Sequence, residues 1–121
     1  MGDSIIGEKS FRFAVRIVNL YKYLSEKKEY VLSRQILRSG TSIGANVSEA
    51  LDAQSDKDFV SKMGIALKES AETMYWLRLL RETEYITDLQ FEAMNKDARE
   101  LKLIISSIIK TKKENMELSE K

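Results

Sequence analysis

The sequence predicts an all-α protein, and three observations carry this prediction. The 121 residues contain no proline and only five glycines, so little in the chain interrupts a helix. Apolar residues recur at three- and four-residue steps over most of the chain, which is the spacing of an amphipathic helix. Short polar segments divide these periodic stretches from one another. The chain is therefore expected to form four helices joined by short turns.

The expected helices make up one domain. They span about residues 8–27, 31–52, 56–82 and 88–112. Residues 1–7 are expected to form a flexible N-terminus, residues 8–110 the bundle and residues 113–121 a solvated C-terminal tail. Helices of this length with short turns are typical of an antiparallel up-down-up-down four-helix bundle.

The apolar faces of these helices define the expected core. In the first helix the inward positions are Phe11, Val15 and Val18, flanked by Ala14, Ile17, Tyr21 and Leu24. The later helices contribute Leu32, Ile36, Ile43, Val47 and Leu51, then Phe59, Met63, Ala66, Ser70, Leu77 and Leu80, and finally Phe91, Met94, Ala98, Leu101, Ile105 and Ile108. The last two helices look wider on their apolar side than one core requires, so part of that surface is expected to meet another subunit.

Two polar segments carry signals for the start of a helix. Ser55 or Asp56 is suited to cap the N-terminus of the third helix. Thr87 and Gln90 form the T-x-x-Q pattern of a capping box ahead of the fourth helix. The third and fourth helices are therefore expected to begin close to these residues.

The composition argues against an enzyme. The chain has no cysteine and no histidine, which removes disulfides, thiol nucleophiles, imidazole bases, serine–histidine triads and the usual zinc sites. A di-metal site built on Glu49, Asp52, Glu69 and Glu72 would also need histidine ligands. The stretch GTSIG at residues 40–44 lacks the lysine of a phosphate-binding loop. No catalytic, cofactor-binding or metal-binding residue is therefore predicted.

Small residues inside the second helix predict a close helix contact. Gly40, Gly44 and Ser48 stand four residues apart on one stripe, and each interior glycine costs about 1 kcal/mol of helix propensity relative to alanine. Such a cost is expected where a neighbouring helix approaches closely, or where the helix breaks locally near residues 39–41. Ser42, Asn46 and Ser48 are expected to form hydrogen bonds across this interface.

Charged residues on the second and third helices predict an ion-pair network. Arg34 and Arg38 lie one turn apart, as do Glu69 and Glu72, and Glu49 adds a carboxylate to the second helix. Guanidinium groups can hold carboxylates bidentately, which would fix the register of two helices or two subunits. Solvated charges and an anion site are the competing interpretations.

Two groups of basic residues are candidate nucleic-acid contacts. They lie in the first helix and near the end of the fourth: Lys9, Arg12, Arg16, Lys110, Lys112 and Lys113. Antiparallel packing would bring the two groups to the same end of the bundle. The chain as a whole has a formal net charge of only +1, so a solvated surface is the competing interpretation. Tyr75, Trp76 and Tyr85 invite a base-stacking role, although aromatic residues at helical spacing more often pack in a core.

Two stretches of the chain resemble a known family: RQILRSGTSIGANVSEA and the later DFVSKMGIALKESAETMYWLRLL. This is the family of small bacterial four-helix bundle proteins encoded in intervening sequences of large-subunit ribosomal RNA genes. The residues that carry the resemblance are Arg34, Gln35, Arg38, Ser42, Ile43, Asn46, Glu49, Phe59, Ala66, Ser70, Glu72 and Leu77. The similarity covers about residues 11–109. Ala50 stands where many relatives have glycine.

The resemblance implies a homopentameric ring of four-helix bundles without enzymatic activity, possible RNA or ribosome association, and an unknown specific role. A related branch, the accessory proteins of diversity-generating retroelements, implies an alternative: a nucleic-acid-binding adaptor that partners a reverse transcriptase or another protein. The nearly neutral chain departs from the strongly basic members of that branch. The expected partners are thus further copies of the chain, with RNA, DNA or a protein as additional candidates. The chain shows neither a signal peptide nor a membrane span, and a cytoplasmic location is expected.

Overall fold

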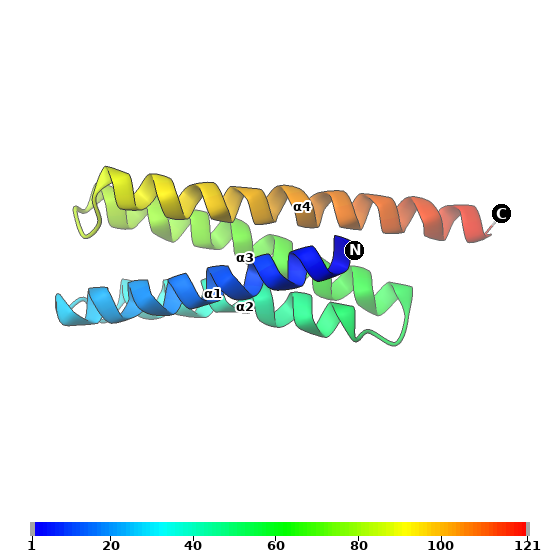
Figure 1. Ribbon diagram of the computed structural model, residues 1–121, viewed down its shortest axis with the longest axis horizontal. Coiled ribbons are helices and arrows are strands. Elements are labelled where there is room, and N and C mark those ends of the chain that lie inside the picture. The colour runs from blue at the N-terminus through cyan, green and yellow to red at the C-terminus, as the bar shows by residue number, and fades with distance from the viewer. Residues whose placement is uncertain (1, 121) are drawn as a thin grey trace.

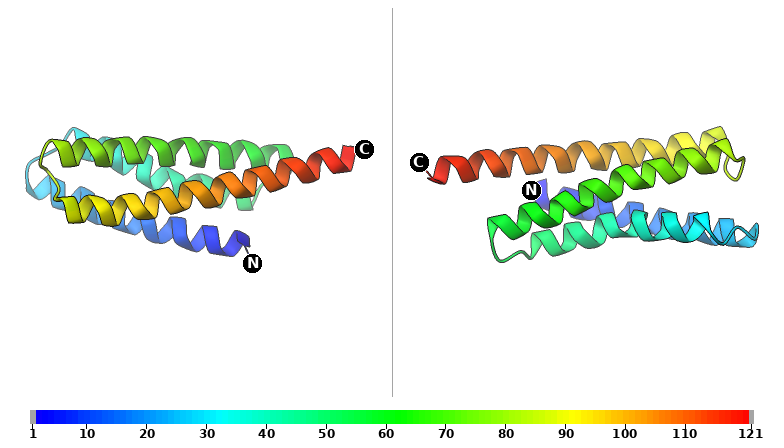
Figure 2. Two further views of the ribbon diagram at one scale, coloured as in Figure 1. Left: turned by 90° about the horizontal axis from the view of Figure 1, so that it is seen from above. Right: turned by 180° about the vertical axis from the view of Figure 1, so that it is seen from behind.

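Four helices form an antiparallel bundle. The computed structural model describes residues 2–120, with side chains from Ile5 onward, and contains no strand in that range. The helices are α1 (Gly2–Glu26), α2 (Leu32–Leu51), α3 (Asp56–Glu82) and α4 (Asp88–Glu120). Successive helices run in opposite directions, so the N-terminus of α1 and the C-terminus of α4 lie at the same end (Figures 1 and 2). The predicted all-α class is confirmed.

The first and last helices are longer than the sequence predicts. The helical region begins at Gly2, and the fully buried side chain of Ile6 anchors its first turns to the core. At the C-terminal end of the chain, α4 continues to Glu120 and projects beyond the other helices (Figure 1). The expected tail is thus helical, although most of its side chains are exposed. Met1 and Lys121, the outermost residues of the two predicted termini, lie outside the described residues.

The core is formed by one stripe from each helix. On α2, α3 and α4 it contains most of the predicted positions: Ile36, Ile43, Val47, Met63, Ala66, Ser70, Leu77, Leu80, Phe91, Met94, Ala98, Leu101 and Ile105. Leu51 is an exception, since 38% of its surface remains exposed. The three- and four-residue spacing thus identifies the inward faces of these three helices.

The predicted inward face of α1 is right only in part. The flanking positions Ile17 and Leu24 are buried, but Phe11 is 65% exposed and Val15 is 46% exposed, and Phe13, which was not among the predicted positions, is buried. Helix α1 carries apolar residues on two of its faces, and both faces show helical spacing. Spacing alone therefore does not reveal which face meets the core, and the exposed face of α1 needs a separate explanation.

Side-chain caps begin α3 and α4 at the predicted places. The hydroxyl of Ser55 accepts a hydrogen bond of 3.0 Å from the backbone N–H of Asp58. Thr87 and Gln90 form a reciprocal capping box, in which each side chain accepts the backbone N–H of the other at 3.1 and 2.8 Å. Both predicted helix starts are confirmed.

A buried carboxylate caps the start of α2, although no capping pattern in the sequence predicts it. Glu29 is only 7% exposed, and its Oε1 accepts the backbone N–H groups of Val31 and Leu32 at 3.2 and 2.8 Å. Its Oε2 accepts the N–H of Ser33 at 2.9 Å. One side chain thus satisfies three N–H groups at the start of the helix, where a negative charge also suits the helix dipole.

Glu29→Ala is expected to destabilise the protein by about 1–2 kcal/mol, because the N–H groups at the start of α2 lose their acceptor. Urea unfolding monitored by circular dichroism measures this loss. Glu26→Ala is the matched control, since Glu26 is exposed at the end of α1. Equal stability of the two variants would show that the cap contributes nothing.

The turns after α1 and α3 close in the same way. Lys28 and Glu84 adopt left-handed backbone conformations, with φ of 65° and 67°. In each turn the next residue donates its N–H to a carbonyl five residues earlier, from Glu29 to Leu24 and from Tyr85 to Leu80, both at 2.9 Å. This is the Schellman ending, which usually has glycine at the left-handed position.

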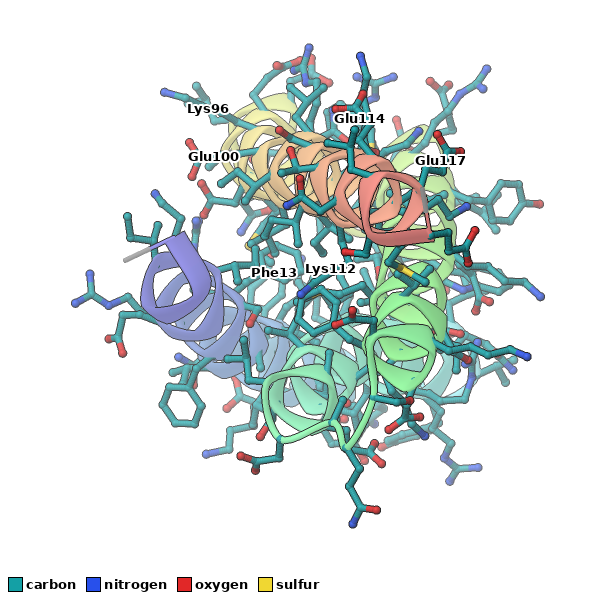
Figure 3. All side chains as sticks on the ribbon, turned by 90° about the vertical axis from the view of Figure 1, so that its right-hand side faces the viewer. Phe13, Lys96, Glu100, Lys112, Glu114 and Glu117 are labelled. Carbon is teal, nitrogen blue, oxygen red and sulfur yellow. The ribbon has the colours of Figure 1, made fainter. Side chains whose placement is uncertain are left out.

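Neighbouring helices pack unequally around the bundle. Contacts are dense between α1 and α2, α2 and α3, and α3 and α4, and they are sparse between α4 and α1. Figure 3 shows the bundle end-on, with α1 at the left, α2 at the bottom, α3 at the right and α4 at the top. The α1–α4 seam is therefore the least tightly packed side of the bundle.

Candidate interaction surfaces

Gly40 and Gly44 set the close approach of α1 to α2. A Cβ atom on Gly40 would stand 2.6 to 2.8 Å from three side-chain carbons of Ile17. A Cβ on Gly44 would stand 3.1 Å from the backbone oxygen of Ser10. Both distances are shorter than ordinary van der Waals contact, so a side chain at position 40 would displace Ile17, and one at position 44 would press on the backbone of α1. Ser48, the third member of the stripe, is exposed.

A groove without charged residues follows this close contact on the outside of the bundle. It has a volume of about 350 Å³ and is lined by Gly7, Phe11, Ala14, Thr41, Gly44, Ala45, Ser48 and Leu51. Val15 stands next to it, four residues after Phe11 on the exposed side of α1. We call these residues together the α1/α2 face. In a chain with 32% charged residues, an uncharged face of this extent is a candidate interface.

The basic residues of α1 face carboxylates. Lys9 contacts Glu100 of α4, with 2.7 Å between Nζ and Oε1, and Arg16 forms an ion pair with Asp97 of the same helix. Arg12 pairs with Glu8 one turn earlier in α1, at 2.9 Å. All three candidate nucleic-acid residues of α1 therefore have their charge matched by a carboxylate. The first two pairs bridge the sparse seam between α1 and α4.

The basic residues of α4 do not join those of α1. Lys112 turns toward α3, where its Nζ lies 3.3 Å from Oδ1 of Asp56 and 4.9 Å from the centre of the Phe59 ring. In the end-on view it points in between the helices (Figure 3). Lys110 and Lys113 are exposed on the projecting part of α4. Among these six candidate residues, no single basic surface is therefore evident.

The contact between Lys9 and Glu100 predicts a weaker α1–α4 seam in acid. The hydrogen bond from Lys9, and then its charge, lower the pKa of Glu100 below the ordinary value of 4.5. A lowered folded-state pKa gives stability that is present above the unfolded pKa and is lost as the pH falls through the folded one. Between about pH 6 and pH 3, wild type should therefore lose more stability than Glu100→Gln. Equal losses, measured by urea unfolding at each pH, would contradict this account.

An ion-pair network joins α2 to α3. Arg38 donates to Glu69 at 3.1 Å and also pairs with Glu72, whose Oε2 accepts the indole N–H of Trp76 at 2.9 Å. The hydroxyl of Thr73 donates to that of Ser39 at 2.9 Å beneath this network. The carboxylates of Glu69 and Glu72 thus lie where the predicted network requires them.

The remaining candidates of this group lie apart from the network. Arg34 is exposed and forms no salt bridge with the side chains that the structure describes. Glu49 lies 3.5 Å from Lys62 of α3. Asn46 donates to the carbonyl of Ser42 at 2.8 Å, which is a bond within α2. The expected hydrogen bond from these two residues across the helix interface is therefore replaced by a local one.

The other sequence candidates define no chemical site. The described residues include no group of three or more Asp, Glu, Cys or His side chains placed to hold a metal ion. Of the three aromatic candidates, Tyr75 is 59% exposed and packs edge-on against Trp76 with 5.0 Å between ring centres, while Tyr85 is half-buried. Over the described range, no helix is long and apolar enough to cross a membrane.

The fold and its surfaces define a small four-helix bundle with an uncharged external groove. The model of the 23S rRNA-intervening sequence protein family matches residues 2–107. The chain therefore belongs to this family, as its resemblance in the second and third helices suggested.

A solved structure is closely similar. The crystal structure at 1.70 Å of a protein with unknown function, from the S23 ribosomal protein family of Bacteroides thetaiotaomicron VPI-5482, has 59% sequence identity and a TM-score of 0.89. The match covers 91% of this chain and 99% of that one. A comparison with curated proteins finds no match. Neither the family description nor this relative names an enzymatic activity.

Proposed function

We propose that the protein is a non-enzymatic scaffold that acts as a homo-oligomeric ring, with five copies as the family resemblance implies. The observation that carries the proposal is the α1/α2 face. Phe11 and Val15 lie there in contact with solvent, although the same helix buries Phe13 and Ile17. Covering this surface in an assembly removes apolar area from water, at about 25 cal/mol per Å².

The shape of this face favours a ring over a two-fold dimer. Its centre is a groove lined mostly by small residues, namely glycine, alanine, serine and threonine, together with the larger Phe11 and Leu51. Two grooves placed against each other would leave both unfilled, whereas a convex helix from a different face of the next copy fills one. A contact between different faces repeats from copy to copy, and it forms a ring when the rotation from one copy to the next closes on itself.

The alternative function is a nucleic-acid-binding adaptor for a reverse transcriptase or another protein. The arrangement of the six candidate basic residues gives it little support, because Lys9, Arg12 and Arg16 already face carboxylates. A cytoplasmic location remains part of the proposal for either function.

A single introduced cysteine tests the proposed interface, since the chain has none of its own. Ser48→Cys places a thiol in the groove, and Ser61→Cys places one at an exposed position of α3 as the matched control. In the assembled protein we expect a maleimide to label Ser61→Cys quickly and Ser48→Cys slowly. Equal labelling rates at all protein concentrations would contradict the proposed interface.

A further inference from the structure

A second groove, between α3 and α4, differs in chemistry from the α1/α2 face. Its volume is about 400 Å³, and its lining is Ala71, Met74, Tyr75, Arg78, Phe91, Asn95 and Lys102. Arg78 of α3 and Lys102 of α4 supply one cation from each helix, and both are exposed. No carboxylate lines this groove. It therefore presents positive charge beside an exposed aromatic ring.

Two further cations, outside the lining itself, flank the groove. Lys68 lies seven residues before Tyr75 on the same side of α3, and Arg99 lies between Asn95 and Lys102 on α4. The same spacing places Glu82 and Asp88 near the end of the groove where α3 meets α4, so the positive charge is concentrated away from that end. The stretch of α3 from Lys68 to Arg78 is about 15 Å long at 1.5 Å per residue. That length matches about four phosphates at the ~3.4 Å spacing of a stacked strand.

The four cations are free of the ion pairs that neutralise other bases of the protein. Lys9, Arg12, Arg16, Arg38 and Lys112 each contact a carboxylate. Lys68, Arg78, Arg99 and Lys102 form no salt bridge with any side chain that the structure describes, and the same is true of bases elsewhere such as Lys22, Lys57 and Lys110. What sets the groove apart is that two of these cations, Arg78 and Lys102, lie in a lining without a carboxylate.

The aromatic and amide groups of the groove suit a base rather than a phosphate alone. Tyr75 is 59% exposed, and its edge-on contact with Trp76 holds the ring in place. The side-chain amide of Asn95 is half-buried and can both donate and accept hydrogen bonds. Proteins usually bind single-stranded nucleic acid with aromatic rings that stack on its bases, next to positive charges that contact its phosphates. A duplex suits such a site less well, because its bases are already stacked on one another.

We propose that the α3/α4 groove binds single-stranded nucleic acid, with Lys68, Arg78, Arg99 and Lys102 along the phosphates and Tyr75 stacked on a base. This surface is distinct from the α1/α2 face, which has no carboxylate to pair with these cations. Pressing the two faces together would bury unmatched charge at a cost of several kcal/mol. The proposal therefore does not rest on the assembly.

Binding of a fluorescent 20-residue oligouridine, followed by anisotropy, tests the proposal. Wild type should bind at low salt, with an affinity that falls as salt rises. Arg78→Glu and Lys102→Glu should each weaken binding about tenfold or more and lower the slope of log affinity against log salt by about 0.7 or more. Lys22→Glu makes the same charge change at an exposed position of α1 and should alter affinity by less than about threefold.

Variants of Tyr75 separate base stacking from simple attraction of charge. Tyr75→Ala should weaken oligouridine binding about tenfold, whereas Tyr75→Phe keeps a ring and should bind as wild type does. Binding of inorganic polyphosphate, which has no bases, should not change with Tyr75→Ala. All variants should elute at the wild-type size, because each altered residue is exposed.

Several results would overturn the proposal. The first is a lack of oligouridine binding by wild type at low salt. The second is a loss of affinity in Lys22→Glu as large as in Arg78→Glu and Lys102→Glu. The third is a Tyr75→Ala variant whose affinities for oligouridine and for polyphosphate fall equally. Preference for a duplex over the single strand would also contradict it. A wild type that binds oligouridine as a monomer would leave this inference intact while refuting the ring.

Discussion

Gly40→Leu is expected to lower the melting temperature by up to about 10 °C. The first added atom alone would lie 2.6 to 2.8 Å from three carbons of Ile17, in a site where both residues are fully buried. Overpacking costs about 1–3 kcal/mol and occasionally more. The roughly 1 kcal/mol that replacing glycine gains in helix propensity does not offset this cost. Thermal unfolding by circular dichroism measures the change.

Gly64→Ala is the matched control for this substitution. Gly64 also lies inside a helix, but a Cβ there would meet no heavy atom within 4 Å. Gly64→Ala should therefore raise the free energy of unfolding by up to about 1 kcal/mol. If Gly40→Leu melted at the same temperature as wild type, the claim that Gly40 and Gly44 are needed for the close packing of α1 on α2 would be contradicted.

Phe11→Glu is expected to dissociate the assembly without unfolding the subunit. The side chain is 65% exposed in the single copy, so the substitution should change folding stability by no more than about 0.5 kcal/mol. In the assembly the same position would bury a carboxylate without a partner, at a cost of about 2–5 kcal/mol of association free energy. Sedimentation velocity at micromolar concentration should show the mass fall.

Leu89→Glu serves as the control for Phe11→Glu. Leu89 is 84% exposed at the start of α4, far along the chain from the α1/α2 face. It should leave the assembly intact. A Phe11→Glu protein that kept the wild-type mass would place the subunit contact on another face.

The core of α2, α3 and α4 was predictable because most of the predicted inward positions are buried, although α3 and α4 also carry exposed apolar residues such as Ile65 and Leu103. Helix α1 was predictable only in part, since it carries one stripe for the core, with Phe13 and Ile17, and a second at the surface, with Phe11 and Val15. The same spacing rule fits both. Only the position of the neighbouring helices decides between them.

The helix starts and ends show the same contrast. Thr87 and Gln90 form a pattern that predicts their hydrogen bonds, and these bonds are present. Glu29 caps α2 from outside the usual N-cap position, and Lys28 and Glu84 stand where glycine would signal a Schellman ending. Short sequence patterns identify caps only when the residue types are the usual ones.

The candidate charged surface could not be predicted from the charges alone. The basic stripe of α1 is prominent in the sequence, yet its partners Asp97 and Glu100 lie far away in the chain. Arg78 and Lys102 are inconspicuous in the sequence because they belong to different helices. Pairing across helices decides which charges remain unmatched, and this depends on the packed structure.

The mass of the wild-type protein in solution tests the central claim most directly. One chain has a mass of 13.9 kDa, so a ring of five has a mass of about 70 kDa. Native mass spectrometry at micromolar concentration should give this value as the main species. A main species at 13.9 kDa under the same conditions would contradict the account, because the α1/α2 face would then be left open to solvent.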